Sequence, residues 1–111
     1  MDIQLTKDAD ALICLIYKYY LDLHDRGIPK PKAKFLGSSK DIHDNIIPEW
    51  QFEDVDDTCS ELGRKHLLSV VYADDICYEV TLTDNGIIYM ENRFQGKIKL
   101  LLDYISAIKF W

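Results

Sequence analysis

The residues best suited to metal chemistry are three cysteines and three histidines, and they are scattered along the chain. Cys59 and His66 are seven positions apart, close to two helical turns, so their side chains could share one helix face. A zinc site, however, needs four ligands, or three and a water, in a tetrahedral array. No further ligand has a suitable spacing, and we predict no metal site and no cofactor.

Patterns for acid–base and nucleophilic chemistry are also incomplete. His43 and Asp44 are sequence neighbours, and we expect that they cannot face each other on a helix. Asp74 and Asp75 fall in a predicted turn, which explains two aspartates without an acid pair. The chain has no glycine-rich phosphate loop and no nucleophile elbow. We therefore expect that this protein is not an enzyme.

Charge is the strongest chemical signal in the sequence. The net charge is -6, but positions 41–61 hold eight acidic residues and no lysine or arginine, whereas positions 26–40 hold five basic residues and no acid. An acidic surface suits a basic partner, but an acidic helix face can also be simply a solvated face, and both interpretations remain open at this point. The residues predicted to form such an acidic interaction face are Glu53, Asp54, Asp56, Asp57, Glu61, Asp74 and Asp75.

The basic residues support two interpretations, which both remain open at this point. They could be a solvated surface that offsets the neighbouring acids, or they could contact phosphate or an acidic partner. If the chain binds nucleic acid, the residues predicted to do so are Lys30, Lys32, Lys34, Lys40, Arg64 and Lys65.

The acidic residues lie on a predicted helix that leads into a β-hairpin. Phe52, Val55, Cys59 and Leu62 form one apolar stripe at helical spacing. The runs 67–72 and 76–82 are rich in strand-forming residues. In the second run Ile76, Tyr78, Val80 and Leu82 alternate with Cys77, Glu79 and Thr81, which is period two. Only three residues separate the two runs, which is hairpin length. Thr83 is then a good N-cap for a further helix.

This arrangement resembles the winged helix-turn-helix proteins, including the MarR and PadR regulator families. The matching residues are Leu62, Leu67 and Leu68 at the end of the third core helix, and Tyr78-x-x-x-Leu82-Thr83-x-x-Gly86 leading out of the wing. The resemblance covers about residues 40–94. The whole chain also looks like small winged-helix proteins of Gram-positive bacteria and their phages, the YjcQ kind. The resemblance implies a mainly α fold with a β-hairpin. It also implies a regulator of a kind that binds DNA and often dimerises through its terminal helices.

The glycine that usually ends the recognition helix in those families falls at His66 in this chain. Histidine is among the residues other than glycine that are enriched at positive φ. We therefore expect His66 to end the helix in a left-handed conformation and not to bind a metal.

Before the acidic helix, the pattern predicts three further features. A helix should start near Thr6 and stop at Gly27. A short helix opened by Pro31 should hold Phe35, which we expect to be buried. Ser38 and Asp41 should form a capping box at the start of the next helix.

The last helix, predicted over 97–111, is apolar on more than one side. Ile98, Leu101, Ile105 and Ile108 supply the stripe that packing on a small domain requires. The surplus apolar residues predict a homodimer or a docked partner, unless the helix is buried on both sides. These residues are Leu100, Leu102, Tyr104, Phe110 and Trp111.

Length and composition predict one soluble globular domain over residues 1–111, with helices before the wing and at the C-terminus. No secretory signal opens the chain and no apolar run could span a bilayer. Cys14 and Cys59 lie on predicted apolar faces, so we expect reduced, buried thiols and a cytoplasmic location.

Two hypotheses on function follow. In the first, the chain is a non-catalytic winged-helix regulator, bacterial or phage-encoded, that acts through protein contacts of its acidic face, for example by inhibiting a nucleic-acid-binding protein. In the second, it is a DNA-binding transcriptional regulator. The acidic recognition helix disfavours the second, because DNA carries about one negative charge per 1.7 Å of its axis.

Overall fold

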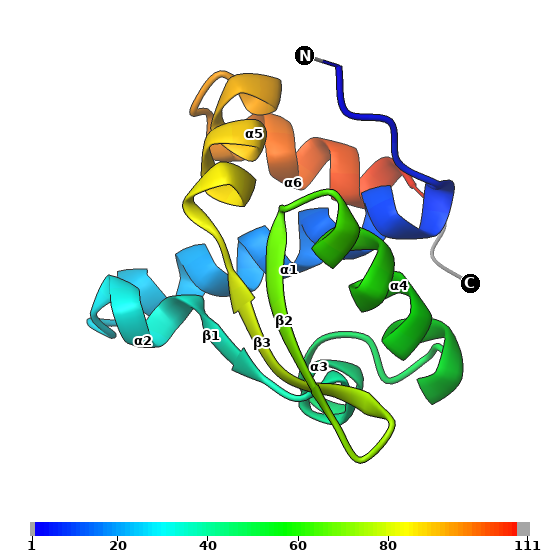
Figure 1. The fold of residues 1–111 in the computed structure, drawn as a ribbon. Helices are drawn as coiled ribbons and strands as arrows, with labels where there is room; N and C mark the ends of the chain where they lie inside the picture. The colour runs from blue at the N-terminus through cyan, green and yellow to red at the C-terminus, as the bar shows by residue number, and fades with distance from the viewer. Residues whose placement is uncertain (1, 109–111) are drawn as a thin grey trace.

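The computed structural model describes residues 2–108 (Figure 1). The prediction of a mainly helical chain with a β-hairpin is confirmed for these residues, which form six helices and one three-stranded antiparallel sheet. In chain order the elements are α1 (Lys7–Asp25), α2 (Lys30–Lys34), β1 (Phe35–Gly37), α3 (Ser39–Ile46), α4 (Phe52–Arg64), β2 (Leu68–Ala73), β3 (Ile76–Leu82), α5 (Asp84–Phe94) and α6 (Ile98–Ala107).

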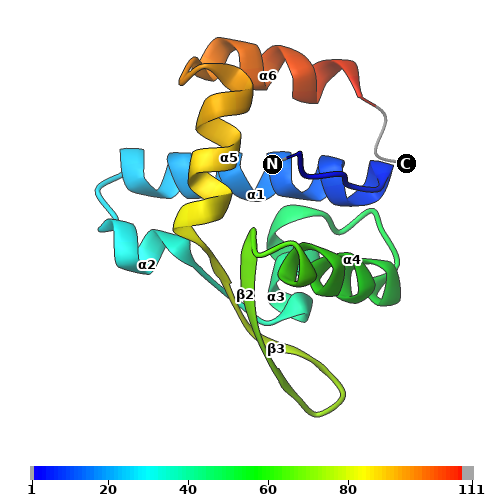
Figure 2. The same ribbon diagram turned by 45° about the horizontal axis from the view of Figure 1, so that its top comes forward.

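The first helix, α1, is central to the packing. It contacts every other helix in the described part of the chain. Figure 2 shows α6 on one side of α1, and the sheet with α3 and α4 on the other. Helix α1 can occupy this position because apolar residues surround most of its circumference. Its buried residues are Ala9, Ala11, Leu12, Ile13, Cys14, Ile16, Tyr17 and Tyr20.

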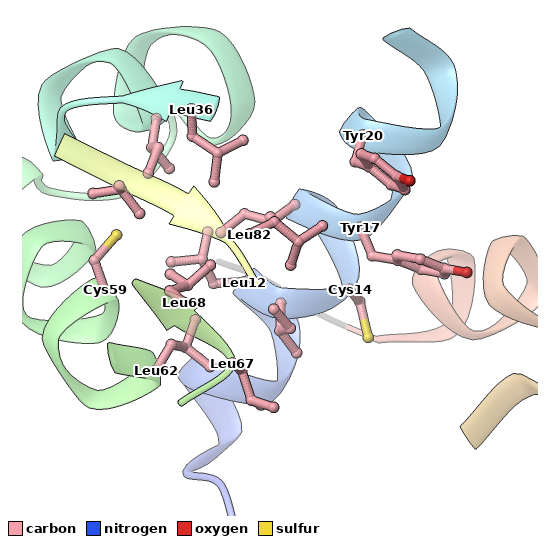
Figure 3. Close-up of a cluster of buried hydrophobic side chains, with 14 of the residues drawn as sticks. Leu12, Cys14, Tyr17, Tyr20, Leu36, Cys59, Leu62, Leu67, Leu68 and Leu82 are labelled. Carbon is pink, nitrogen blue, oxygen red and sulfur yellow. The ribbon is translucent and has the colours of Figure 1, made fainter. Parts of the chain in front are cut away.

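One hydrophobic cluster joins α1 to α4 and to the hairpin (Figure 3). Leu12, Leu62, Leu67 and Leu82 are all completely excluded from solvent in this cluster. Burying an aliphatic side chain of this kind stabilises the fold by about 1.5–3 kcal/mol. The hairpin is therefore held to the helices by its base, and its tip projects away from them (Figure 2).

The helix starts follow the polar pattern of the sequence. Thr6 is the N-cap of α1, and its side chain accepts a hydrogen bond from the Ala9 amide at 3.2 Å. Ser38 and Asp41 form the predicted capping box of α3. The Thr83 hydroxyl accepts from the Gly86 amide at 2.9 Å and so caps α5. These three predictions are confirmed.

The end of α4 is set by His66, whose φ is 63°. Its amide donates to the Gly63 carbonyl, and the Leu67 amide donates to the Leu62 carbonyl at 3.1 Å. This pair of hydrogen bonds is the pattern of a helix that stops in a left-handed residue. The prediction that His66 caps the helix is confirmed.

Gly86 lies where α5 starts against the hairpin. A Cβ at this position would collide with the Leu67 carbonyl oxygen and would lie 2.9 Å from Leu82 Cδ1. The same Leu67 carbonyl accepts hydrogen bonds from the amide and the hydroxyl of Thr83. Only glycine permits this close approach of the two backbones.

The sheet order is β1-β3-β2, so β3 is the central strand. The alternation expected for β3 is wrong at Tyr78, because a β-bulge leaves Tyr78 without a partner between the pairs Val71–Glu79 and Tyr72–Cys77. One extra residue reverses the faces of the side chains that lie between the bulge and the hairpin tip. Cys77 is consequently buried, while Tyr78 is 48% exposed.

The expectation that Phe35 is a buried helical residue is also wrong. Helix α2 ends at Lys34, and Phe35 begins β1, which pairs with β3 through Thr81. The Phe35 side chain is 51% exposed, whereas Leu36 is buried. A three-residue strand has too little sequence for an alternating pattern, so its pairing with β3 decides the conformation.

The final helix is shorter than predicted and is turned about its axis. It ends at Ala107, because Ile108 is extended, and residues 109–111 lie outside the described part of the chain. Leu101 is buried as expected, but Ile98 is 55% exposed and Tyr104 points inward. In the described residues, no helix combines the length and the apolar character needed to cross a membrane.

Candidate interaction surface

The acidic helix α4 has a buried and an exposed side. Its apolar stripe is confirmed, since Val55, Cys59 and Leu62 are fully buried. The carboxylates of the predicted acidic face divide into two groups: some form hydrogen bonds within the fold, and the others extend into solvent. This division separates structural acids from those that are free to bind a partner.

Asp56 belongs to the structural group. Its Oδ1 accepts a hydrogen bond from the Ser39 hydroxyl at 2.6 Å and another from the Cys77 amide at 2.9 Å. These bonds join α4 to α3 and to β3. The amide of Cys77 is available because the bulge leaves this part of β3 irregular.

Glu61 has a similar role at the other end of α4. Its two carboxylate oxygens accept from the amide and the hydroxyl of Thr6, at 2.9 and 2.7 Å. Thr6 also caps α1, so Glu61 fixes the first turn of that helix against α4. Asp56 and Glu61 are therefore engaged within the fold, which reduces the predicted acidic face by two residues.

The other five acids are exposed on α4 and on the hairpin. In residues 2–108, none of their side chains makes an ion pair or a hydrogen bond. We name this set the acidic surface; its members are Glu53, Asp54, Asp57, Asp74 and Asp75.

The hairpin turn presents two of these carboxylates in an unusual way. Ala73 pairs with Ile76, so Asp74 and Asp75 form a two-residue loop, and their φ values are 54° and 63°. Positive φ at both positions is the geometry of a type I′ turn, which favours Asn-Gly. Two aspartates in this turn place two carboxylates at the tip at a conformational cost.

Exposed aromatic residues lie beside the acidic turn. Tyr72 is 60% exposed and Tyr78 is 48% exposed. The Tyr72 hydroxyl donates to Ser60 Oγ at 3.1 Å, which lays the side chain across toward α4. The sequence pattern grouped Tyr78 with the apolar residues of its strand, because the bulge that exposes Tyr78 has no signature in the sequence.

The basic residues of the alternative nucleic-acid site are divided between two places. Lys30, Lys32 and Lys34 lie on α2, by the β1 edge of the sheet, whereas Arg64 and Lys65 end α4 by the β2 edge (Figures 1 and 2). Lys40 is exposed on α3. Lys34 Nζ also forms an ion pair with Asp84 at 2.9 Å. The structure does not gather this set into one patch.

The C-terminal helix carries the other predicted contact residues. Leu100 and Leu102 are 41% and 40% exposed, and Phe110 and Trp111 lie outside the described residues. Tyr104 differs from the prediction: its hydroxyl donates to Asp10 on α1, and its ring packs on Phe94. Tyr104 therefore attaches α6 to the rest of the fold and is not free for a partner.

Asp10, Arg93 and Tyr104 form a cluster where α1, α5 and α6 meet. The Arg93 guanidinium pairs with both oxygens of Asp10 and lies 4.5 Å from the centre of the Tyr104 ring. Burial acts to raise the pKa of Asp10, but hydrogen bonds from Arg93 and Tyr104 outweigh it and hold the pKa below its usual value. The cluster explains why Tyr104 turns inward.

The candidates for metal and acid–base chemistry are separated in the structure. Cys59 is buried and His66 is exposed, and no group of His, Cys, Asp or Glu in residues 2–108 has a geometry that could hold a metal ion. The thiols of Cys14 and Cys59 are buried and free, as predicted. Burial raises the pKa of Cys14 to about 12.

One expectation about the histidines is wrong. His43 Nδ1 lies 2.7 Å from Asp44 Oδ1, although the two residues are neighbours in sequence. The contact forms near the end of α3, where the ring can lie along the chain while its Nε2 contacts the Trp50 carbonyl at 2.8 Å. The hydrogen bond with Asp44 raises the pKa of His43.

Comparison with protein-family models, with curated proteins and with solved structures gives no match for this chain. The acidic surface is defined by the geometry of this chain alone.

Proposed function

We propose that this chain is a non-catalytic winged-helix module that binds a basic surface of a protein partner through its acidic surface. The observation that carries the proposal is the lack of partners for Glu53, Asp54, Asp57, Asp74 and Asp75 within residues 2–108. Neighbouring carboxylates repel one another, and a partner rich in lysine or arginine would relieve that repulsion.

The order of elements supports the winged-helix part of the proposal. Two helices, a strand, two helices and a hairpin follow one another, and the early strand joins the sheet beside the second strand of the hairpin. The resemblance to winged-helix proteins implies the helices before and after this hairpin, although it did not predict the early strand. In a winged-helix arrangement, α4 is the recognition helix and the hairpin is the wing.

The hairpin supports the protein-binding part of the proposal. Two aspartates occupy left-handed positions that Asn-Gly would occupy at lower cost, and strained positions are often retained for function. Tyr72 and Tyr78 lie beside them and are exposed. Tyrosine is enriched at protein interfaces, where its ring supplies contact area and its hydroxyl supplies a hydrogen bond.

The same residues would oppose DNA at both elements that a winged helix presents to it. Three carboxylates project from α4 and two from the turn, and each would approach phosphate. A gel shift with duplex DNA at low salt tests this directly. We expect no retardation of the wild type, and we expect the variant D54K/D57K to bind weakly and with strong salt dependence.

The protein contact is tested by capture from a host extract with matched variants. The variant D54N/D57N removes two charges from the acidic surface, and D8N/D25N removes two exposed charges from α1 as a control. We expect one protein to be retained by the wild type and the control, to be released by salt, and to be lost from D54N/D57N. Equal capture by all three chains would contradict the proposal, and so would tight binding of wild-type protein to duplex DNA.

If the captured protein binds DNA, a second measurement locates the contact. Duplex DNA should displace this chain, because both would occupy the same basic surface. Simultaneous binding of DNA and this chain would place the contact elsewhere on the partner.

A further inference from the structure

A pocket of about 510 Å³ lies between α1, α2 and α5, away from the acidic surface. Tyr17 and Tyr20 of α1 form part of its lining, with Leu21 beside them. Figure 3 shows both tyrosines projecting from α1 with their hydroxyl ends directed away from the labelled leucines of the core. The pocket has the volume typical of sites for small molecules.

The two tyrosine hydroxyls open onto the pocket. Tyr17 is 7% exposed and Tyr20 is 5% exposed, so most of each residue is buried. In residues 2–108 neither hydroxyl makes a hydrogen bond to another residue. Because no fully buried polar side-chain atom in these residues lacks a hydrogen-bond partner, both hydroxyl oxygens must reach the surface of the pocket. A ligand in the pocket can therefore form hydrogen bonds with both of them.

The tyrosine rings are fixed in position by stacking. Their ring centres are 6.3 Å apart, and Tyr20 stacks on His24 at 6.4 Å with the planes within 6° of each other. The His24 ring is held in turn by a 3.0 Å contact between its Nδ1 and the Ile28 carbonyl oxygen. A prearranged row of this kind reduces the entropy that a ligand must overcome on binding.

Charges of opposite sign line the two walls of the pocket. Lys30 and Lys34 come from α2, and Asp84 and Glu91 come from α5. Lys34 and Asp84 neutralise each other across one end. Within the described residues, Lys30 and Glu91 form no ion pair. One positive and one negative group therefore remain, on opposite walls.

The rest of the lining is apolar. Ile87 and Ile88 of α5 face Leu21 of α1 around the pocket. An apolar lining with a few convergent polar groups is the usual composition of a ligand site. A ligand with only one charge would match either Lys30 or Glu91 and would leave the other unmatched.

From these observations we propose that the pocket binds a small zwitterion, an apolar amino acid or dipeptide. Its carboxylate contacts Lys30, its ammonium group contacts Glu91, and its polar atoms bond the hydroxyls of Tyr17 and Tyr20. The apolar side chain packs against Leu21 and Ile87. None of these residues belongs to the acidic surface, so this site and the proposed protein contact succeed or fail independently.

The first test uses dipeptides with free or blocked ends. Leucyl-leucine, its N-acetyl form and its C-terminal amide are titrated into the ¹⁵N-labelled full chain, together with a panel of free dipeptides that differ in side chain. We expect at least one free dipeptide to shift amide signals of α2 and α5, and we expect blocking either of its ends to weaken binding by about tenfold or more. Equal binding of free and blocked forms would overturn the proposal, as would no shift with any member at millimolar concentration.

The second test assigns each end of the ligand to its wall. Lys30 and Glu91 are exposed at the rim, so the variants K30Q and E91Q should fold normally, and K32Q on the same helix is the matched control. K30Q should remove the preference for a free carboxylate, E91Q should remove the preference for a free amine, and K32Q should bind like the wild type. If K30Q or E91Q binds the dipeptide more weakly but keeps the wild-type preference for free over blocked ends, the charged side chains do not contact the ligand.

Discussion

Two regions of this protein use the same chemical group in opposite ways. Where α1, α5 and α6 meet, the Asp10 carboxylate is enclosed by Arg93 and Tyr104. On the outer side of α4, Asp54 and Asp57 extend into solvent, and neither has a side-chain partner among residues 2–108. A partly buried carboxylate is stable only with donors around it, whereas an exposed one remains available. The comparison therefore separates acids that hold the fold from acids that can bind another molecule.

The largest expected effect is at the enclosed carboxylate, Asp10. Arg93→Met should lower the free energy of unfolding by about 3 kcal/mol, because it leaves Asp10 partly buried without its charged partner. Urea denaturation of the variant measures this. The double variant R93M/D10N should recover part of the loss, because it also removes the orphaned charge. A double variant no more stable than R93M would show that Arg93 acts through packing alone.

The two kinds of acid can next be compared on one helix. Asp56→Ala should lower the free energy of unfolding by about 2 kcal/mol, because it removes hydrogen bonds from Ser39 and Cys77 to a charged acceptor. Asp57→Ala, one position along, should change it by less than about 0.5 kcal/mol. Thermal or urea unfolding of both variants provides the comparison. Equal losses would mean that the outward carboxylate is also structural.

Acid titration of stability should distinguish the same two regions. The pKa of Asp10 is lower in the folded chain than its ordinary value. Its contribution to stability is therefore present above the ordinary carboxyl pKa of about 3.9 and is lost as pH falls through the lower folded value. The difference in stability between the wild type and Asp10→Asn should shrink over that window. A difference that stays constant as the pH is lowered would contradict the assignment.

The smallest effect is expected at His43, which is intermediate between the two regions because its partner Asp44 is exposed. The hydrogen bond with Asp44 raises the folded pKa of His43. The contribution of this hydrogen bond to stability is thus complete below the ordinary imidazole pKa of about 6.5. It is lost as the pH rises through the higher pKa of His43 in the folded chain. NMR titration of the His43 ring in the wild type and in Asp44→Asn should show a lower pKa in the variant. Identical titration curves would exclude the hydrogen bond as the cause.

Local signals in the sequence predicted much of the fold. Thr6, Ser38 and Thr83 were identified as caps because an N-cap depends on one side chain and the next few backbone amides. His66 was identified because the glycine that usually ends the recognition helix in the winged-helix families falls at this position, and histidine tolerates the left-handed conformation. These predictions succeeded because the interactions that decide them lie within a few residues of each other.

The errors arose where distant residues decide the outcome. Phe35 joins a sheet whose central strand is more than forty positions away, and Tyr104 turns toward an aspartate that lies ninety-four positions earlier. Asp56 and Asp57 look equivalent in the sequence, yet only Asp56 meets Ser39 and Cys77. The acidic surface was therefore predicted by composition, but its true membership required the tertiary contacts.

The contact between Gly86 and the Leu67 carbonyl has a mechanical consequence. Gly86 lies in the first turn of α5, the helix that also carries Ile87 and Glu91 of the pocket and Arg93 of the cluster with Asp10. The Leu67 carbonyl contacts Gly86 and accepts hydrogen bonds from Thr83, so the start of α5 is held against the base of the hairpin. A substitution that separates the two backbones at Gly86 would therefore displace the helix that supplies both a wall of the pocket and the charged partner of Asp10.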